Sequence, residues 1–255
     1  MCSILFAWRP DHPLPLVLAA NRDEFYARPA AALSVWDDNS GIIAGRDLEA
    51  GGTWLGLQSA GRFAALTNIR DPQRKDGLYS RGELVSGFLH SNESPMAYLQ
   101  RIAQRSEHYA GFNLLAGDHQ QLCFLNAAEG TPRVLQAGVY GLSNASLNTP
   151  WPKVMRARQA LSDCLAKPDD QALLALLADP WTPTDELLPN TGISLEMERL
   201  LASTFIHSDH YGTRASTTLR LHQDGRYELF ERSFGPHGQA FNEVKLAGQF
   251  AQDLA

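Results

Sequence analysis

Long apolar runs are missing from this 255-residue sequence. The longest ones, at residues 3–8 and 14–20, are far shorter than the roughly 20 apolar residues that span a bilayer, so no transmembrane helix is expected. A secretory signal needs a basic leader and about 7 to 15 apolar residues, whereas the polar segment 9–12 interrupts the first apolar run. The sequence therefore indicates a cytoplasmic protein.

Cysteine is scarce, and the net charge is −6. The three cysteines, at positions 2, 123 and 164, form no C-x-x-C motif, so neither a disulfide framework nor a thiol metal site is expected. The H-x-D-H segment at 207–210 lacks the H-E-x-x-H spacing, and no metal site is predicted there. The negative charge argues against nucleic acid and anionic lipid as general partners. A small molecule is the expected partner, and the oligomeric state stays open.

Periodicity predicts an α+β fold. Apolar runs bounded by turn residues predict strands at 3–9, 15–24, 41–46, 52–58, 62–68, 111–116, 121–127, 134–142, 213–222, 226–234 and 243–249. Helical spacing predicts helices at 81–90, 95–108, 151–166, 170–177 and 194–205, and loops are expected at 27–39 and 178–193. Alternating blocks of strands and helices imply antiparallel sheets with segregated helices. Because no linker or repeat divides the chain, a single domain over 1–255 is expected.

The amino terminus supplies the first candidate site. Cys2 follows the initiator Met1, and a small residue at this position permits removal of the methionine. Cys2 would then carry a thiol and a free α-amine, whose ordinary pKa values are about 8.5 and about 7.7–8.0. The amine can accept the proton of the thiol at modest cost, which makes the pair a nucleophile with its own base. The alternative is an incidental cysteine at the second position.

Four polar residues, Asn21, Arg22, Asp23 and Glu24, end the second predicted strand. Alternation sends Asn21 and Asp23 to one face of the strand. Arg22 and Glu24 then lie on the other face, where they can pair with each other or with a second layer. A carboxylate beside Cys2 could orient its amine. The alternative is a strand end with a local ion pair, which is a common feature that contributes little energy.

Several motifs together resemble one known family. They are Met-Cys-Ser-Ile at 1–4, the tetrad at 21–24, Gly-Gly-Thr-Trp-Leu-Gly at 51–56, Ala-Leu-Thr-Asn at 65–68, Gly-Leu-Ser-Asn at 141–144 and Tyr-Gly-Thr-Arg-Ala-Ser-Thr at 211–217. Their order and their spread over nearly the whole chain resemble the NRDE family, also called the transport and Golgi organisation family. That family resembles the N-terminal-nucleophile (Ntn) hydrolases, particularly the cysteine branch with penicillin V acylase and bile-salt hydrolase.

The resemblance implies a four-layer αββα sandwich, in which two stacked antiparallel sheets are covered by helices. It implies that Cys2 is the nucleophile and that Asp23 contacts the amine of Cys2. It also implies that Asn144 donates a hydrogen bond to the oxyanion and that Asn68 is a second amide nearby. One such donor can contribute about 2.7 to 4 kcal/mol to transition-state stabilisation.

The arginines match the cysteine acylases less closely. Those enzymes tend to carry an arginine three residues before their aspartate, where this sequence has Ala20, and Arg22 is expected to point away from the face of Asp23. Arg214 is the alternative cation that could lower the pKa of the thiol. It could equally be a strand-edge residue paired with an acidic side chain of the tetrad. The remaining supporting or substrate-binding residues that we expect are Asn21, Arg22, Glu24 and Trp54.

Two functions follow. The first is a cysteine amidohydrolase or acyltransferase that acts on a non-peptide acyl amide or thioester and needs no cofactor. The second is a non-catalytic carrier on the same fold, for haem or for a lipid-like or acyl-CoA ligand, because the family resemblance also allows an apolar cleft. Loss of Met1 and inactivity of a Cys2→Ala variant would favour the first, and a haem titration tests the second.

Overall fold

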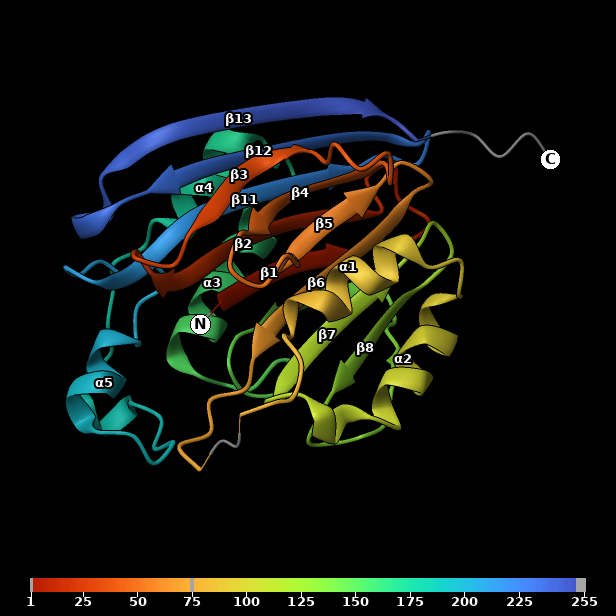
Figure 1. Ribbon diagram of the computed structural model, residues 1–255. Coiled ribbons are helices and arrows are strands. Elements are labelled where there is room, and N and C mark those ends of the chain that lie inside the picture. Colours follow the sequence, from red (N-terminus) through yellow and green to blue (C-terminus); the bar gives the residue numbers. More distant parts are fainter. Residues whose placement is uncertain (1, 74–75, 251–255) are drawn as a thin grey trace.

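Two antiparallel sheets stack face to face in the computed structural model, which describes residues 2–73 and 76–250 (Figure 1). The first sheet contains six strands in the order β10 (Gly138–Leu142), β1 (Cys2–Trp8), β2 (Leu16–Phe25), β11 (Tyr211–Leu221), β12 (Arg226–Phe234) and β13 (Ala240–Gln249). The second contains seven in the order β3 (Ala30–Val35), β4 (Ile42–Asp47), β5 (Leu55–Gln58), β6 (Arg62–Asn68), β7 (Phe112–Gly117), β8 (Leu122–Asn126) and β9 (Arg133–Val134).

Helices cover the outer faces of both sheets (Figure 1). The α-helices are α1 (Gly82–His90), α2 (Pro95–Ala103), α3 (Pro152–Cys164), α4 (Asp170–Leu177) and α5 (Leu195–Leu200), and three short 3₁₀ turns are η1 (Ser106–His108), η2 (Asp185–Leu187) and η3 (Pro236–Gly238). None of the helices in residues 2–73 and 76–250 combines the length and the apolar character needed to cross a membrane.

Strand β1 is largely apolar because both of its faces are covered. Along β1, Ile4 and Phe6 face the second sheet, whereas Leu5 and Ala7 face the helices. Every residue of β1 is buried. A short continuous apolar run is the expected pattern for a strand at the centre of such a sandwich.

Three apolar cores lie between four layers. One core fills the space between the sheets, and a second packs α1 and α2 on the second sheet through residues such as Phe88 and Leu99. The third packs α3 and α4 on the first sheet through Leu161 and Leu173. The predicted αββα sandwich is confirmed.

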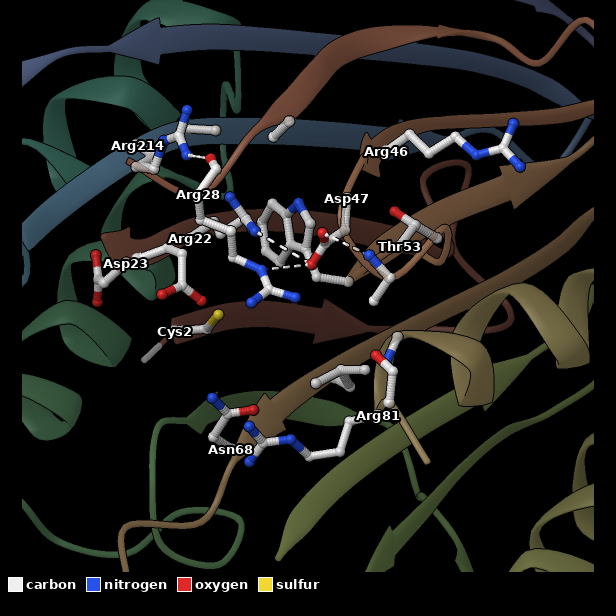
Figure 2. A pocket seen from close by; sticks show the side chains of 18 of the residues that line it. Cys2, Arg22, Asp23, Arg28, Arg46, Asp47, Thr53, Asn68, Arg81 and Arg214 are labelled. Atoms are coloured by element: carbon white, nitrogen blue, oxygen red, sulfur yellow. Dashed lines mark hydrogen bonds and ion pairs between the residues drawn. The ribbon is translucent and has the colours of Figure 1, made fainter. Parts of the chain in front are cut away.

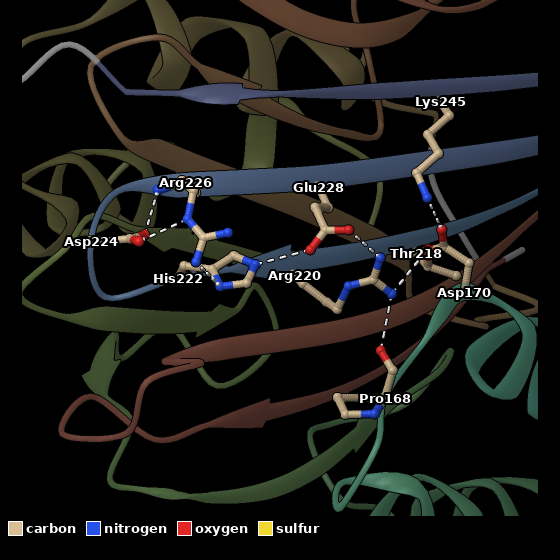
Figure 3. A network of polar contacts seen from close by, with 9 residues as sticks. All are labelled: Pro168, Asp170, Thr218, Arg220, His222, Asp224, Arg226, Glu228 and Lys245. Atoms are coloured by element: carbon tan, nitrogen blue, oxygen red, sulfur yellow. Dashed lines mark hydrogen bonds and ion pairs between the residues drawn. The ribbon is translucent and has the colours of Figure 1, made fainter.

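A polar network fixes the start of α4 on the first sheet (Figure 3). Arg220 of β11 donates from Nη1 to the carbonyl of Pro168 at 2.9 Å and from Nη2 to Glu228 Oε2 at 2.8 Å. The same guanidinium lies 2.9 Å from Asp170 Oδ1, and Lys245 Nζ lies 2.8 Å from the other oxygen of that carboxylate. The network therefore connects α4 with three neighbouring strands.

Several of the predicted elements differ from the structure in type or extent. The helix predicted at 95–108 ends at Ala103 and is followed by η1. The expected loop at 27–39 contains β3, whose only buried residue is Leu33, so the strand lacks an apolar pattern. The strand predicted at 134–142 is two strands in different sheets, because the chain crosses between the sheets there and buries Leu135 in the central core. The helix predicted at 194–205 ends at Leu200, since the carbonyl groups of the residues that follow accept hydrogen bonds from Lys153 and Asn21.

Candidate functional site

A cavity of about 480 Å³ lies where β1 begins and β6 ends. Its walls come from both sheets and from two connecting segments, 50–54 and 76–82. Of the residues that the sequence analysis selected, those lining the cavity are Cys2, Arg22, Asp23, Glu24, Trp54, Asn68 and Arg214. Asn21 and Asn144 do not line it.

Strand alternation directs Cys2 and Arg22 into the cavity. Cys2 has the same parity as Ile4 and Phe6, which face the second sheet, and its Cα partner on β2 is Arg22. Figure 2 shows the Cys2 side chain between a group of arginines and Asn68. The cavity is thus the polar end of the space whose remainder is filled by the central core.

Arg22 was predicted to pair either with Glu24 or with a residue of a second layer. The structure shows the second arrangement, because Oδ2 of Asp47 on β4 lies 3.9 Å from Arg22 Nη2. Glu24 does not take that role, since its Oε1 accepts the backbone N–H of Phe25 at 2.9 Å. Arg22 and Asp23 belong to opposite faces of β2, as the alternation predicted.

Burial dominates the electrostatics of Cys2. The residue is 6% exposed, and burial raises the pKa of its thiol. The negative charge of Asp23 raises this pKa further, whereas the positive charge of Arg22 and the backbone N–H of Asp23 oppose the rise. A thiol in this environment stays protonated near neutral pH, so its use as a nucleophile requires an adjacent base.

Asp23 lies at the junction between β2, β11 and α3. Its Oδ1 accepts a hydrogen bond from Thr213 Oγ1 at 2.7 Å, and the residue is 1% exposed. Burial raises the pKa of Asp23, whereas the charge of Lys153 and the hydrogen bond from Thr213 lower it. The backbone N–H of Asp23 also acts on the Cys2 thiol, so this buried carboxyl group belongs to a residue beside the start of β1.

The two asparagines of the predicted oxyanion site lie together but have different surroundings. Asn68, at the end of β6, lines the cavity. Asn144 Nδ2 donates to the backbone carbonyl of Asn68 at 2.9 Å, and its Oδ1 accepts from Ser143 Oγ at 3.2 Å. Asn144 is 1% exposed, so this side chain fixes the backbone of Asn68 and does not face the cavity.

Asn21 is a connector between layers. Its Nδ2 donates to the carbonyl groups of Leu177 and Thr204 at 3.0 and 2.9 Å, and its Oδ1 accepts from Ser216 Oγ at 2.6 Å. All three contacts lie on the helix side of the first sheet. Asn21 therefore supports the site by fixing the end of α4 and the segment after α5.

Arg214 occupies a bulge in β11, between Thr213 and Ala215. Its Nη1 donates to the carbonyl of Phe25 at 3.2 Å and to the carbonyl of Arg28. Burial and the positive charge of Arg22 lower the pKa of Arg214, whereas the negative charge of Glu24 raises it. The bulge turns the guanidinium group into the cavity wall.

Trp54 and its neighbours form the wall that faces α1. Gly52 makes a close approach there, because a Cβ on it would lie 2.5 Å from the carbonyl carbon of Gly82. Trp54 packs against the central core and lines the cavity. Gly52 thus permits close backbone packing beside the site.

Sequence reasoning missed Lys153, a buried lysine of α3 that is 5% exposed. Its Nζ donates to the carbonyl groups of Leu201 and Ser203 at 2.9 and 3.5 Å, and burial lowers its pKa to about 8. The charges of Asp23 and Cys2 raise this pKa and therefore act against the effect of burial. The signal was available, since Lys153 falls in the apolar stripe of α3 with Ala157 and Leu161.

Sequence reasoning also missed Asp47 and Arg28. Arg28 Nε donates to Asp47 Oδ2 at 2.8 Å, and both residues line the cavity. These residues are brought to Cys2 only by the stacking of the sheets. Within the described ranges, no group of three or more His, Cys, Asp or Glu side chains is arranged for a metal ion.

Comparisons with known proteins agree with the motif assignment. Residues 1–236 match the family described as Transport and Golgi organisation 2. The Transport and Golgi organization protein 2 homolog of Bos taurus is 37% identical, with 91% of this chain and 93% of that protein aligned. Transport and Golgi organization protein 2 of Drosophila melanogaster is 28% identical, with 98% and 99% aligned. The resemblance drawn from the sequence motifs is confirmed.

The fold has a counterpart of known structure. The C2A mutant of conjugated bile acid hydrolase from Clostridium perfringens superposes with a TM-score of 0.50 over 99% of this chain and 97% of that one. The sequences are 9% identical, so this likeness concerns the fold. The Ntn-hydrolase-like architecture expected from the resemblance is confirmed.

Proposed function

The chain belongs to the Transport and Golgi organisation 2 family, and we propose that it is a cysteine hydrolase or acyltransferase of the Ntn type. Its substrate is a non-peptide acyl amide or thioester. One observation carries the proposal: Cys2 begins a central strand and lines a cavity that also contains Arg22, Asp23 and Asn68. An amino-terminal nucleophile needs this combination of a rigid strand and an open cavity.

The first step depends on processing. Met1 lies outside the described residues, and its removal would leave a free α-amine on Cys2. Burial raises the pKa of the Cys2 thiol, so the thiol proton needs an acceptor, and the amine of the same residue is within reach. The buried carboxylate of Asp23 orients the resulting ammonium, and the guanidinium of Arg22 stabilises the thiolate.

The chemical steps use the remaining polar groups. The Cys2 sulfur attacks the acyl carbon, and the carbonyl oxygen becomes an oxyanion that accepts a hydrogen bond from the side-chain amide of Asn68. The bond from carbon to the leaving nitrogen or sulfur then breaks, and the ammonium returns its proton to the leaving group. Water cleaves the acyl-enzyme thioester, or an amine accepts the acyl group. Asn144 acts through Asn68 by holding its backbone.

A second candidate function, a carrier without chemistry, is favoured by the raised pKa of the Cys2 thiol. Its ligand would be haem or a lipid-like or acyl-CoA molecule. Of the residue types that hold haem iron, the cavity wall offers Cys2 and Tyr79 but neither histidine nor methionine within the described residues. A saturable change in the haem absorbance spectrum that disappears in Cys2→Ala, without turnover of any acyl substrate, would support the carrier.

The hydrolase proposal is tested on purified full-length protein. We expect the intact mass to lack Met1 and a panel of acyl amides and thioesters to yield a substrate whose acyl group is trapped on the first residue by acid quenching. Cys2→Ala should abolish turnover. Cys164→Ala is the matched control, because Cys164 is a half-buried thiol near the end of α3 and outside the cavity wall. Full activity of a chain that retains Met1, or of Cys2→Ala, would contradict the proposal.

A further inference from the structure

Arg22, Arg28 and Arg214, here called the arginine cluster, gather on one side of the cavity (Figure 2). Arg22 lies on β2, and its Cα partner on β11 is Ala215, the residue after Arg214. Arg28 follows the end of β2, and its carbonyl group accepts a hydrogen bond from Arg214. The three side chains therefore come from adjacent backbone segments and share one wall.

In the part of the chain that the structure describes, the carboxylate of Asp47 lies within ion-pair distance of two members of the cluster. Asp47 Oδ2 is 2.8 Å from Arg28 Nε and 3.9 Å from Arg22 Nη2. Glu49 lies 3.2 Å from Arg28 Nη1, but its side chain is 60% exposed, so solvent screens this pair. Arg28 is consequently the member of the cluster with the shortest ion pairs to carboxylates.

Arg22 and Arg214 are less well neutralised. Arg22 has no hydrogen-bond partner among the described residues, although only 11% of its side chain is exposed. Arg214 donates to two backbone carbonyl groups, which carry no net charge. Burial and then the positive charge of Arg22 lower the pKa of Arg214, which indicates that the two cations are close enough to repel each other.

Two further acids of the wall, Glu231 and Glu24, have backbone partners. Glu231 accepts the backbone N–H of Leu33 at 2.8 Å; burial raises the pKa of its carboxyl group, and the charge of Arg22 opposes that rise. Glu24 accepts the backbone N–H of Phe25. Two guanidinium groups thus face a cavity beside Cys2 with incomplete compensation, and a guanidinium fork matches a carboxylate or a phosphate.

We propose that the cavity selects acyl substrates that carry an anionic group, a carboxylate or a phosphate, bound by Arg22 and Arg214. This inference rests on the proposed function for the position of the reacting carbonyl at Cys2. Because Cys2 and Arg22 are Cα partners, the anionic group lies near the scissile bond. The apolar part of the substrate packs on the apolar residues of the cavity lining, which include Trp54, Leu66 and Leu78.

Binding to the full-length Cys2→Ala variant tests the inference without any requirement for turnover. The probes for isothermal titration are N-decanoyl-glycine, the uncharged N-decanoyl-glycinamide, decyl phosphate and inorganic phosphate. We expect at least one of the two anionic long-chain probes, N-decanoyl-glycine and decyl phosphate, to bind about 10-fold or more tightly than the amide, since hydrogen bonds to charged groups are the stronger class. The carboxylate and phosphate arms identify which anion the cluster prefers.

Substitutions locate the effect. Arg22→Gln in the Cys2→Ala background should reduce the preference for the anionic probe to less than about 3-fold. Arg214→Lys keeps a charge without the planar fork and should retain part of the preference. Arg226→Gln is the matched control, because Arg226 is an exposed arginine that pairs with Asp224 in the β11–β12 hairpin turn. It should leave all affinities unchanged.

The outcomes separate the two proposals. Equal binding of the acid, the phosphate and the amide, binding of inorganic phosphate alone, or no binding of any probe would overturn the anion site and leave the chemistry of Cys2 untouched. An anion preference that depends on Arg22, in a processed wild-type protein that turns over no substrate, would keep the site and reject the hydrolase.

Discussion

Lys153 provides a sharp test of the electrostatics behind the site. The perturbation is Lys153→Met, which keeps an unbranched side chain on the buried face of α3 and removes the charge. In the folded protein burial lowers the pKa of Lys153 from 10.5 to about 8. Between these two pH values the unfolded chain therefore binds a proton that the folded protein does not bind. The free energy of unfolding must then rise with pH across this window.

The magnitude follows from the shift. One pKa unit corresponds to about 1.4 kcal/mol, so the lysine should add roughly 3 kcal/mol to the free energy of unfolding between pH 8 and pH 10.5. Other groups titrate here in the opposite sense. The pKa of Cys123 is raised to about 11 and that of Tyr109 to about 12, mainly by burial, so their contributions to stability are lost as pH rises. Cys123 and Tyr109 are both present in the variant, so their contributions cancel when the free energies of unfolding of wild type and variant are subtracted.

The assay is urea denaturation of wild type and Lys153→Met at four pH values between 7.5 and 10.5. The variant loses the hydrogen bonds of Nζ to Leu201 and Ser203, which changes its free energy of unfolding by an amount that does not depend on pH. The diagnostic quantity is therefore the slope, against pH, of the difference in free energy of unfolding between wild type and variant. Lys167→Met, at an exposed lysine after α3, should give a flat difference. A flat difference for Lys153→Met as well would refute the reasoning.

Three further predictions concern other parts of the structure. Thr213→Val removes the hydrogen bond to Asp23 Oδ1 and should lower the free energy of unfolding by about 1–3 kcal/mol. Urea denaturation measures this loss, and an unchanged midpoint would show that the hydrogen bond does not stabilise the fold. Arg220→Met leaves Asp170 and Glu228 without their shared cation and should cost about 3 kcal/mol at pH 7. Because Arg220 holds the pKa of Glu228 below its usual range, this loss should shrink below pH 4 as the carboxyl group is protonated, and a melting-temperature difference that is constant with pH would contradict it. Phe88→Ala should cost about 3–5 kcal/mol in thermal denaturation, whereas Phe241→Ala, at a ring that is 68% exposed, should cost far less, and similar losses would argue against the core assignment.

The local sequence pattern was sufficient to predict the bounds of an element where that element buries a regular set of apolar residues. The predicted bounds of β6, β12 and α4 agree with the structure, since β12 and α4 carry apolar residues at the period of their own backbone and β6 contains a short continuous apolar run. β3 was not predicted because only one of its residues is buried. The crossing between sheets from β9 to β10 was not predicted because a continuous β-like run does not show the point at which a chain changes sheets.

The candidate site divides in the same way. Alternation along β2 correctly assigned Arg22 and Asp23 to opposite faces, and the position of Cys2 at the start of a strand was correct as well. The motif predicted Asn144 as a donor to the oxyanion, whereas in the structure its Nδ2 donates to the backbone carbonyl of Asn68 and the side chain does not line the cavity. The backbone contacts of Arg214 could not be predicted, because they depend on a bulge that is set by the register of two strands.

The amino-acid sequence by itself determined the α+β class, the strand that presents Cys2 and the parity of the polar tetrad, because these follow from short-range periodicity. The motifs added the family resemblance, which implied the four αββα layers. Only the tertiary structure decided which charges surround the thiol. Stacking of the sheets brings Asp47 and Arg28 to Arg22, and packing of α3 brings Lys153 toward Asp23. Electrostatic interactions depend on distance and burial, and residues far apart in the chain acquire both only when the layers assemble.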